Sequence, residues 1–245
     1  MIGSPAEVIR VGSGHDPTAL PAPGPRDRSA TTEMVVGGIL VALVAVGGLL
    51  FAFRPSPVVV DGWFSFLVSH AKGTWFTRVT VLRYPVVIVA GAIIAAIVTY
   101  RRDPPRAWAC LIGPILAVAT CELVVKPLVG RTLGGVFSYP SGSTTGAAAL
   151  AAVAVLAAPA RWRVVTAVVA SIYALWMALA VVALQWHLPT DAASGLAYGV
   201  GVVLIVDGSA WKVAVRLGPR LHRHRPRRGI RAVVGDRTAD DGHCA

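Results

Sequence analysis

Long apolar runs separated by short polar stretches dominate the chain between about residues 33 and 207. A helix rises about 1.5 Å per residue, so a run of about 20 residues crosses a hydrocarbon core of ~30 Å. The pattern therefore predicts an all-α, polytopic membrane protein. The six predicted transmembrane helices lie at about 33–53, 84–100, 107–125, 146–159, 164–184 and 189–206.

The apolar pattern stops at both ends of the chain. Residues 1–33 carry Pro, Gly, Ser and mixed charge without a hydrophobic period, which predicts a disordered tail and not a signal peptide. Residues 34–208 form the predicted membrane domain, and residues 209–245 form a basic, disordered tail. Between the first two spans, residues 56–82 mix aromatic and polar positions, with Asp61 as a candidate cap. This mixture favours an interfacial helix, with a partly ordered loop as the alternative.

Composition and charge support a membrane location and argue against nucleic acid as a partner. The 245 residues are 55% hydrophobic and 14% charged, where soluble domains carry about 25% charged residues. The net charge is +11, but the basic residues lie beside the predicted spans, where they fix orientation and contact anionic lipid.

The distribution of basic residues also predicts the orientation. Six spans place both termini on one side, and assigning that side to the cytoplasm puts 17 of the 23 Lys and Arg residues inside. We therefore expect a multi-pass protein of the cell membrane with cytoplasmic termini. The basic stretch 212–231 is expected to bind anionic lipids at the membrane surface.

The cysteines and the remaining motifs give few constraints. Cys110 and Cys121 lie eleven residues apart in one predicted helix, which is too far for a disulfide. No metal-ligand spacing and no ATP-binding motif occurs in the sequence. We therefore expect no metal and no cofactor, and neither a pump nor a metal-dependent hydrolase is supported.

Two short polar interruptions carry the candidate chemistry, and the predicted topology places both on the outer face. The Pro-Ser-Gly turn at 140–142 opens a Gly- and Ala-rich helix, whose free N–H groups can bind an anion. Lys126 and Arg131 supply cations just before this turn. His187 and Asp191 lie together at the start of the last span. Cations, backbone donors and a group able to attack phosphorus are what a phosphate site needs.

Each of these residues also has a simpler explanation. Lys126 is compatible with a lysine that reaches from the membrane to water, and Arg131 with a surface loop. The turn could be only a helix start capped by Ser143 or Thr144. Asp191 is harder to explain in this way, because a carboxylate one turn into an apolar helix is expensive and usually functional. By accepting a hydrogen bond from one imidazole nitrogen, Asp191 would leave the other nitrogen free to attack phosphorus.

The order of these residues resembles the type 2 phosphatidic acid phosphatase family, whose members are six-span membrane phosphatases related to vanadium haloperoxidases. The similarity covers about residues 60–207, and its most specific part is the segment 187–191 followed by Ser194 and Gly195. The resemblance implies that His187 is a nucleophile that forms a phosphohistidine and that Asp191 orients it. The residues implied to bind the phosphoryl oxygens are Lys126, Arg131, Ser141, Gly142 and Ser143.

The sequence departs from the family pattern at three places. Leu133 and Gly134 stand where the family has Arg-Pro, and Ala180 and Val181 stand where it has Ser-Arg. Ser143 replaces the histidine that acts as the leaving-group acid in the family. Compensation is expected to come from basic residues of the segment after the first span. The candidates are His70, Arg78 and Arg83.

Three functions therefore stay open at this stage. The first is hydrolysis of a lipid phosphate or diphosphate at the outer leaflet, with a polyprenyl diphosphate or a phospholipid phosphate as substrate. The second is binding of such a lipid without turnover, and the third is a purely structural membrane protein. His187 and Asp191 favour the first function, and Ser143 and Val181 favour the second.

Overall fold

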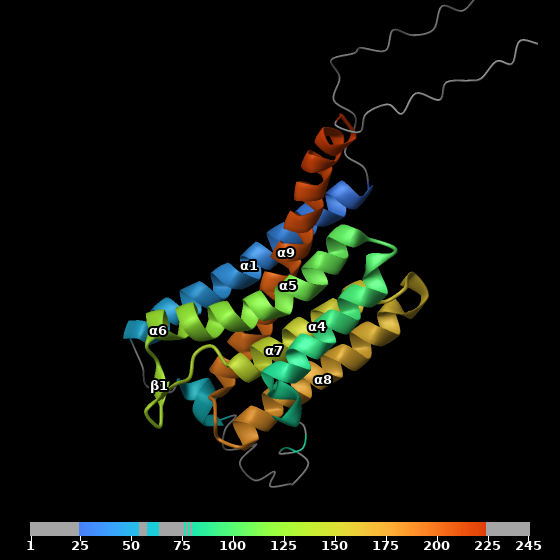
Figure 1. Cartoon of the computed structure of the whole chain (residues 1–245). Helices are drawn as coiled ribbons and strands as arrows, with labels where there is room; N and C mark the ends of the chain where they lie inside the picture. The colour runs from blue at the N-terminus through green and yellow to red at the C-terminus, as the bar shows by residue number, and fades with distance from the viewer. Residues whose placement is uncertain (1–24, 54–57, 64–75, 77, 79, 224–245) are drawn as a thin grey trace, which may run out of the picture.

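The computed structural model describes residues 25–53, 58–63, 76, 78 and 80–223, with the side chains of 53, 82 and 218–223 left out. Each of the six predicted apolar segments contains a helix of a bundle (Figure 1). The main helices are α1 (Pro25–Phe53), α4 (Pro85–Tyr100), α5 (Pro104–Thr120), α7 (Gly142–Ala157), α8 (Arg163–Ala183) and α9 (Pro189–Arg223). The shorter elements are η1 (Thr80–Arg83), the π-helix η2 (Cys121–Val125), α6 (Lys126–Val129), η3 (Ala160–Trp162) and the strands β1 (Thr132–Leu133) and β2 (Val136–Phe137).

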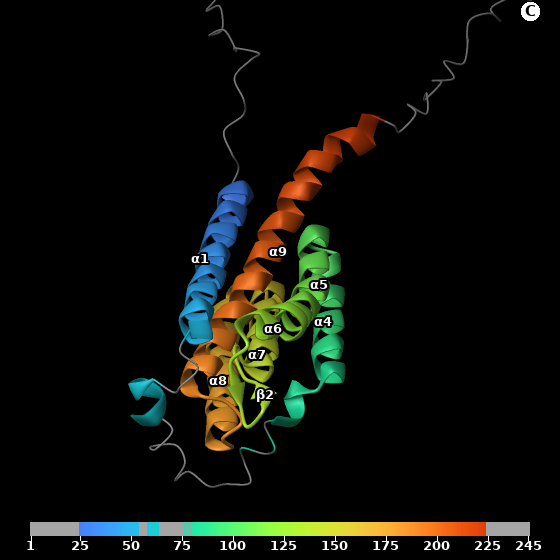
Figure 2. The same cartoon turned by 90° about the vertical axis from the view of Figure 1, so that its left-hand side faces the viewer.

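Helix α7 is the central helix of the bundle and contacts α4, α5, α8 and α9. Its buried residues are mostly small, including Ala147, Ala148 and Ala149. Small side chains let neighbouring helices approach closely, which is how helices associate in a membrane. The same principle acts between α1 and α9, which lie side by side in Figure 2. A Cβ on Gly37 would lie 2.5 Å from the carbonyl oxygen of Gly201, so only glycine fits at this contact.

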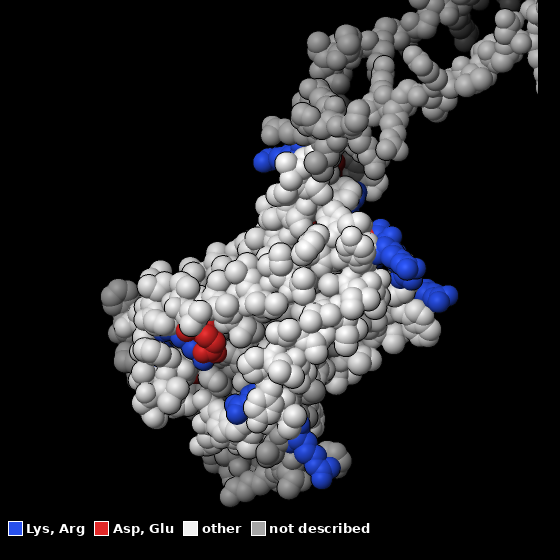
Figure 3. Space-filling view, in the orientation of Figure 1, with Lys and Arg blue, Asp and Glu red and all other residues white. Residues whose placement is uncertain are grey.

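The outer surface of the bundle is apolar, as expected for helices surrounded by lipid. Within the described part of the chain, three helical segments are long and apolar enough to cross a membrane, namely Pro25–Ala52, Pro104–Val129 and Ala160–Ala183. Two further apolar helices, Pro85–Tyr100 and Gly142–Ala157, are shorter. The described charged residues gather towards the two ends of the molecule in Figure 3.

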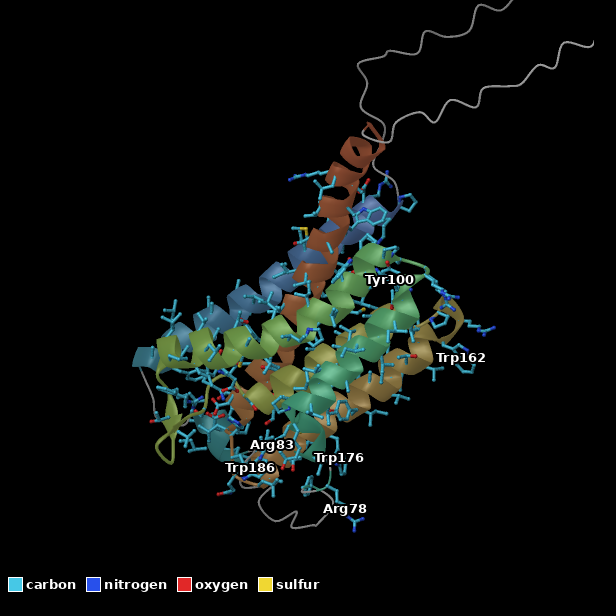
Figure 4. The ribbon with its side chains drawn as sticks, in the orientation of Figure 1. Arg78, Arg83, Tyr100, Trp162, Trp176 and Trp186 are labelled. Carbon is cyan, nitrogen blue, oxygen red and sulfur yellow. The ribbon has the colours of Figure 1, made fainter. Side chains whose placement is uncertain are left out.

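Exposed aromatic residues also lie near both ends of the bundle (Figure 4). Tyr100 and Trp162 lie towards one end, and Trp176 and Trp186 lie towards the other. Tryptophan and tyrosine are enriched at the two interfaces of a membrane, because one end of each ring is apolar and the other is polar. The arrangement therefore agrees with a helical bundle embedded in a membrane.

Helical structure extends into both of the predicted tails. Helix α1 begins at Pro25, so the prediction of disorder up to residue 33 is wrong for residues 25–33. Helix α9 continues to Arg223, so residues 209–223 are helical as well. Residues 1–24 and 224–245 lie outside the described part of the chain.

Ion pairs between distant helices explain the extended start of α1. Arg26 Nη2 and Arg106 Nη2 lie 3.2 and 3.0 Å from an oxygen of Asp207, whose side chain is fully buried in α9. Trp211 Nε1 donates to Asp27 across 2.8 Å. These partners come from separate helices, so the segment could not be recognised as ordered from its local composition.

The predicted interfacial helix falls largely on residues outside the described part. Residues 59–63 form a single helical turn, and 64–75 are not described. Asp61 belongs to this turn and accepts a hydrogen bond from the backbone N–H of Val58 across 3.2 Å. Its side chain is fully buried and points into the site described below.

Candidate phosphate site

The candidate residues meet at the end of the bundle opposite the ends of α1 and α9 that continue into the tails (Figure 1). A short β-hairpin with two residues in each strand connects α6 to the start of α7. Thr132 pairs with Phe137, and Leu133 pairs with Val136. Gly134 and Gly135 form its turn with φ angles of +59° and +82°. Such a turn needs positive φ at both positions, and proline has a fixed negative φ. The hairpin therefore explains the two consecutive glycines at 134 and 135.

Lys126 lies at the junction of the π-helix η2 and α6. Its backbone N–H bonds to the carbonyl oxygen of Cys121, five residues back, as a π-turn requires. Its side chain is almost fully buried, and Nζ lies 2.8 and 2.9 Å from the two carboxylate oxygens of Glu122. The cation is thus held in place by a carboxylate that the sequence analysis did not select.

The start of α7 has the features of an anion site. Ser141 is the N-cap residue, but its side chain makes no capping hydrogen bond. The buried Ser141 Oγ has no hydrogen-bond partner among the described residues. The hydroxyls of Thr144 and Thr145 both donate to the Ser141 carbonyl instead. The first N–H groups of α7 and the Ser141 hydroxyl are therefore available for an anion at the positive end of the helix dipole.

His187 lies in the loop between α8 and α9. Its Nδ1 is 3.0 Å from the carbonyl oxygen of Ser138. A carbonyl can only accept, so Nδ1 carries the proton and Nε2 keeps a free lone pair. Burial, together with the nearby Lys126 cation, lowers the pKa of His187 from 6.5 to about 4. The imidazole is therefore neutral at physiological pH, in the tautomer that a nucleophilic Nε2 needs.

A pocket of about 430 Å³ lies between η1, the hairpin and the loop from α8 to α9, and Ser141, Gly142 and Ser143 do not line it. Lys126 and His187 both line it, together with Arg83 from η1. The guanidinium of Arg83 stacks on the ring of Trp186 with 4.3 Å between the guanidinium carbon and the ring centroid, and the two lie close together in Figure 4. Of the three basic residues expected to compensate for lost arginines, Arg83 therefore reaches the pocket. His70 lies outside the described residues, and Arg78 is exposed.

Arg131 does not face this pocket. It is 1% exposed, and its two terminal nitrogens lie 2.7 Å from Asp191 Oδ1 and 3.1 Å from Asp61 Oδ2. Its guanidinium also stacks on Phe51 at 4.1 Å. Asp61 further accepts from the backbone N–H and the hydroxyl of Thr190, at 2.9 and 3.1 Å. The cluster ties the turn at 59–63, the segment after α6 and the start of α9 together.

The contacts of Arg131 and Asp191 therefore differ from the expected ones. Arg131 is not placed to bind phosphate, because both of its terminal nitrogens are engaged by buried carboxylates. Asp191 accepts from Arg131 and from the backbone N–H of Leu188, and no hydrogen bond joins it to His187 in the described part of the chain. The carbonyl of Ser138 takes the position next to the imidazole instead. Asp191 still acts on the same loop, since its contact with Leu188 fixes the residue after His187.

Replacement of Arg131 by methionine is expected to lower the free energy of unfolding by about 3 kcal/mol or more. Breaking a buried ion pair by removing one partner leaves unpaired charge in a low-dielectric interior, here two carboxylates. Chemical unfolding in detergent micelles measures the change. Arg83→Met is the matched control and should cost less than about 1 kcal/mol, because Arg83 is exposed. Equal losses in both variants would contradict the structural role of Arg131.

No protein-family model matches the sequence, and no curated protein matches it either. A comparison of structures finds a transmembrane PAP2-type phosphatidylglycerolphosphate phosphatase from Bacillus subtilis. The two structures superpose with a TM-score of 0.56 over 70% of this chain and 96% of the other, at 20% sequence identity. This chain has the PAP2-type fold. The fold that the motif resemblance predicted is therefore confirmed by the structural comparison.

Within the PAP2-type fold, three residues of the site were not selected from the sequence. Asp61 and Ser138 hold Arg131 and His187 in place, and Glu122 pairs with Lys126. Glu122 could have been found, since it is an acid in an apolar helix four residues before a lysine. Ser138 acts through its backbone carbonyl, for which the residue type gives no signal.

Proposed function

We propose that this protein hydrolyses a phosphate ester or diphosphate of a membrane lipid, with His187 as the nucleophile. The observation that carries the proposal is that the neutral His187 lines the same pocket as the cation of Lys126. The uncapped start of α7 supports it, because Gly142 lies beside the Lys126 side chain. The fold supports the class of reaction, since the neighbour with the same architecture is a membrane lipid phosphatase.

The reaction has two displacements at phosphorus. First the Nε2 lone pair of His187 attacks, the bond from phosphorus to the leaving oxygen breaks, and a phosphohistidine forms. Lys126 and the first N–H groups of α7 bind the oxygens on which charge accumulates. Water then attacks phosphorus, the nitrogen–phosphorus bond breaks, and orthophosphate leaves. The Ser138 carbonyl stabilises the cationic ring of the intermediate through Nδ1–H, and Asp191 positions the loop through Leu188.

The proposal also includes the placement in the membrane. Six spans would put the pocket at the outer leaflet of the cell membrane and both termini in the cytoplasm. This placement is supported by Arg101, Arg102 and Arg161, which lie in connections at the end of the bundle away from the pocket. Lys212 and the basic residues after it would then contact anionic lipid on the cytoplasmic surface.

The proposed substrates are a phospholipid phosphate and a polyprenyl diphosphate. Phosphate release from a panel of both classes by the purified full-length protein tests the proposal. Lys126→Met should lower the rate by about 10²-fold, the usual effect of removing one group that stabilises the transition state. Lys212→Met is the matched control, since this lysine lies at the other end of the molecule, where it bonds to Thr31.

The second candidate function is binding of a lipid phosphate without turnover. It is favoured by Ser143, which cannot replace a histidine as an acid because a hydroxyl does not release its proton in this pH range. Lipid-phosphate binding that depends on Lys126, without phosphate release, would replace the hydrolase by this function. Absence of both binding and release would contradict the phosphate site itself.

A further inference from the structure

Glu122 is a charged residue of the site that the proposed reaction does not use. It lies in the π-helix η2, and π-helical turns inside longer helices occur frequently at functional sites. Its carboxylate makes a two-oxygen contact with Lys126 Nζ at 2.8 and 2.9 Å. The Glu122 side chain is 42% exposed, so it has access to solvent, whereas the lysine side chain is only 11% exposed.

The position of this carboxylate relative to α7 is unusual. A Cβ added to Gly142 would collide with Glu122 Oε1 and would lie 3.6 Å from Lys126 Nζ. Gly142 is the first residue of α7, so the carboxylate rests on the start of the helix, where the N–H groups are uncapped. The buried, unpartnered hydroxyl of Ser141 precedes the same residue. A carboxylate of the protein itself thus lies against both the Lys126 cation and the start of α7.

We propose that Glu122 is a specificity-determining residue whose carboxylate competes with the phosphoryl group of the substrate for Lys126. This inference rests on the proposed function. A phosphoryl group can bind to Lys126 only if the Glu122 carboxylate leaves it. The phosphoryl group and the carboxylate are both anions and repel each other when they lie close together. The exposed side of Glu122 gives the displaced carboxylate a path into water.

The competition favours lipid substrates over soluble ones. Inorganic phosphate and a soluble phosphate ester bind through the phosphoryl group alone and must displace Glu122 with that group. A lipid substrate gains additional binding from its apolar part, which offsets the displacement. The substrate class is therefore a phosphoryl group attached to a membrane-embedded apolar chain, and small phosphate esters in water are discriminated against.

Glu122→Gln is expected to strengthen the binding of inorganic phosphate by about tenfold or more, because one charge–charge repulsion at ~4 Å is removed and Lys126 becomes free. Calorimetry on the purified full-length protein measures the Kd. The ratio of kcat/KM for p-nitrophenyl phosphate to that for the lipid substrate should rise in the same variant. Asp103→Asn is the matched control, since Asp103 is a partly exposed acid that pairs with Arg26 and Arg106 at the other end of the bundle.

A double variant tests whether the gain in phosphate affinity depends on Lys126. In Lys126→Met the further replacement Glu122→Gln should give a smaller gain than in the wild type, because it removes a charge repulsion but frees no cation. If Lys126→Met weakens phosphate binding while Glu122→Gln leaves it unchanged, the role of Glu122 is overturned and the proposed function stands. If no variant binds phosphate and no lipid phosphate is hydrolysed, the proposed function fails and the inference fails with it.

Discussion

Replacement of His187 by alanine is expected to reduce phosphate release from the lipid substrate by about 10³-fold or more. The substitution removes the atom that forms the covalent intermediate, and the remaining groups can only bind the phosphoryl oxygens. The Ser138 carbonyl loses its partner at the same time. Initial rates with purified wild-type and variant protein measure the effect. Labelled phosphoprotein, quenched in base to preserve phosphohistidine, should form only in the wild type.

The control for this prediction comes from the same loop. Gln185 also lines the pocket and has a φ angle of +59°, which asparagine tolerates well. Gln185→Asn should therefore keep the loop conformation and most of the rate. A His187→Ala variant that retains more than about a tenth of the wild-type rate would exclude His187 as the nucleophile, since losing a nucleophile costs much more than this.

The protonation state of His187 can be checked without substrate. A neutral ring with its proton on Nδ1 is expected down to about pH 4, because burial and the Lys126 cation both lower its pKa from 6.5. The pKa of His187 is lowered because both effects disfavour the charged form, so protonation needs a lower pH than in a free histidine. Nitrogen-15 NMR of histidine-labelled protein, assigned with His187→Ala, reports this titration. A midpoint near pH 6.5 would contradict the buried, neutral ring.

The second large effect concerns the leaving group. Ser143 is the second residue of α7 and aligns with the acid of the family that the motifs resemble. A diphosphate expels a lipid monophosphate, which leaves readily without a proton, whereas a monoester expels an alkoxide that needs one. We expect a diphosphate to be cleaved at least about 10²-fold faster than a monoester of the same lipid, which is the usual size of a general-acid effect. Paired rate measurements with the two substrates test the expectation.

Restoring the acid should reverse this preference in part. Ser143→His is expected to raise the rate with the monoester more than the rate with the diphosphate, since only the alkoxide gains from a proton donor. Ser143→Ala is the control and should leave the ratio of the two rates unchanged. A wild-type protein that cleaves monoesters as fast as diphosphates would mean that another residue supplies the proton.

Much of the fold could be predicted from the sequence, because lipid makes the apolar pattern unusually informative. A helix in hydrocarbon must satisfy its backbone internally and must be apolar on its outside, so each apolar run predicts a helix. The spacing of motifs along these runs also brings Lys126 and His187 to one end of the bundle, where both line the pocket. Local composition did not predict the helical start of α1, where Arg26 pairs with Asp207. It also did not predict that α9 continues past residue 208, where Trp211 bonds to Asp27.

The partners of the charged side chains were decided by the tertiary structure alone. Arg131 looks like a phosphate ligand in the sequence, yet it pairs with Asp61 and Asp191, which are 70 and 60 residues away. Glu122 looks like part of an apolar helix, yet its carboxylate rests on Gly142. The environment of an apolar run can be predicted from its composition, because the preference of an apolar side chain for lipid does not depend on its neighbours in the fold. A buried charge depends on whichever opposite charge the folded chain brings within about 3 Å, and that distance exists only after the helices have packed.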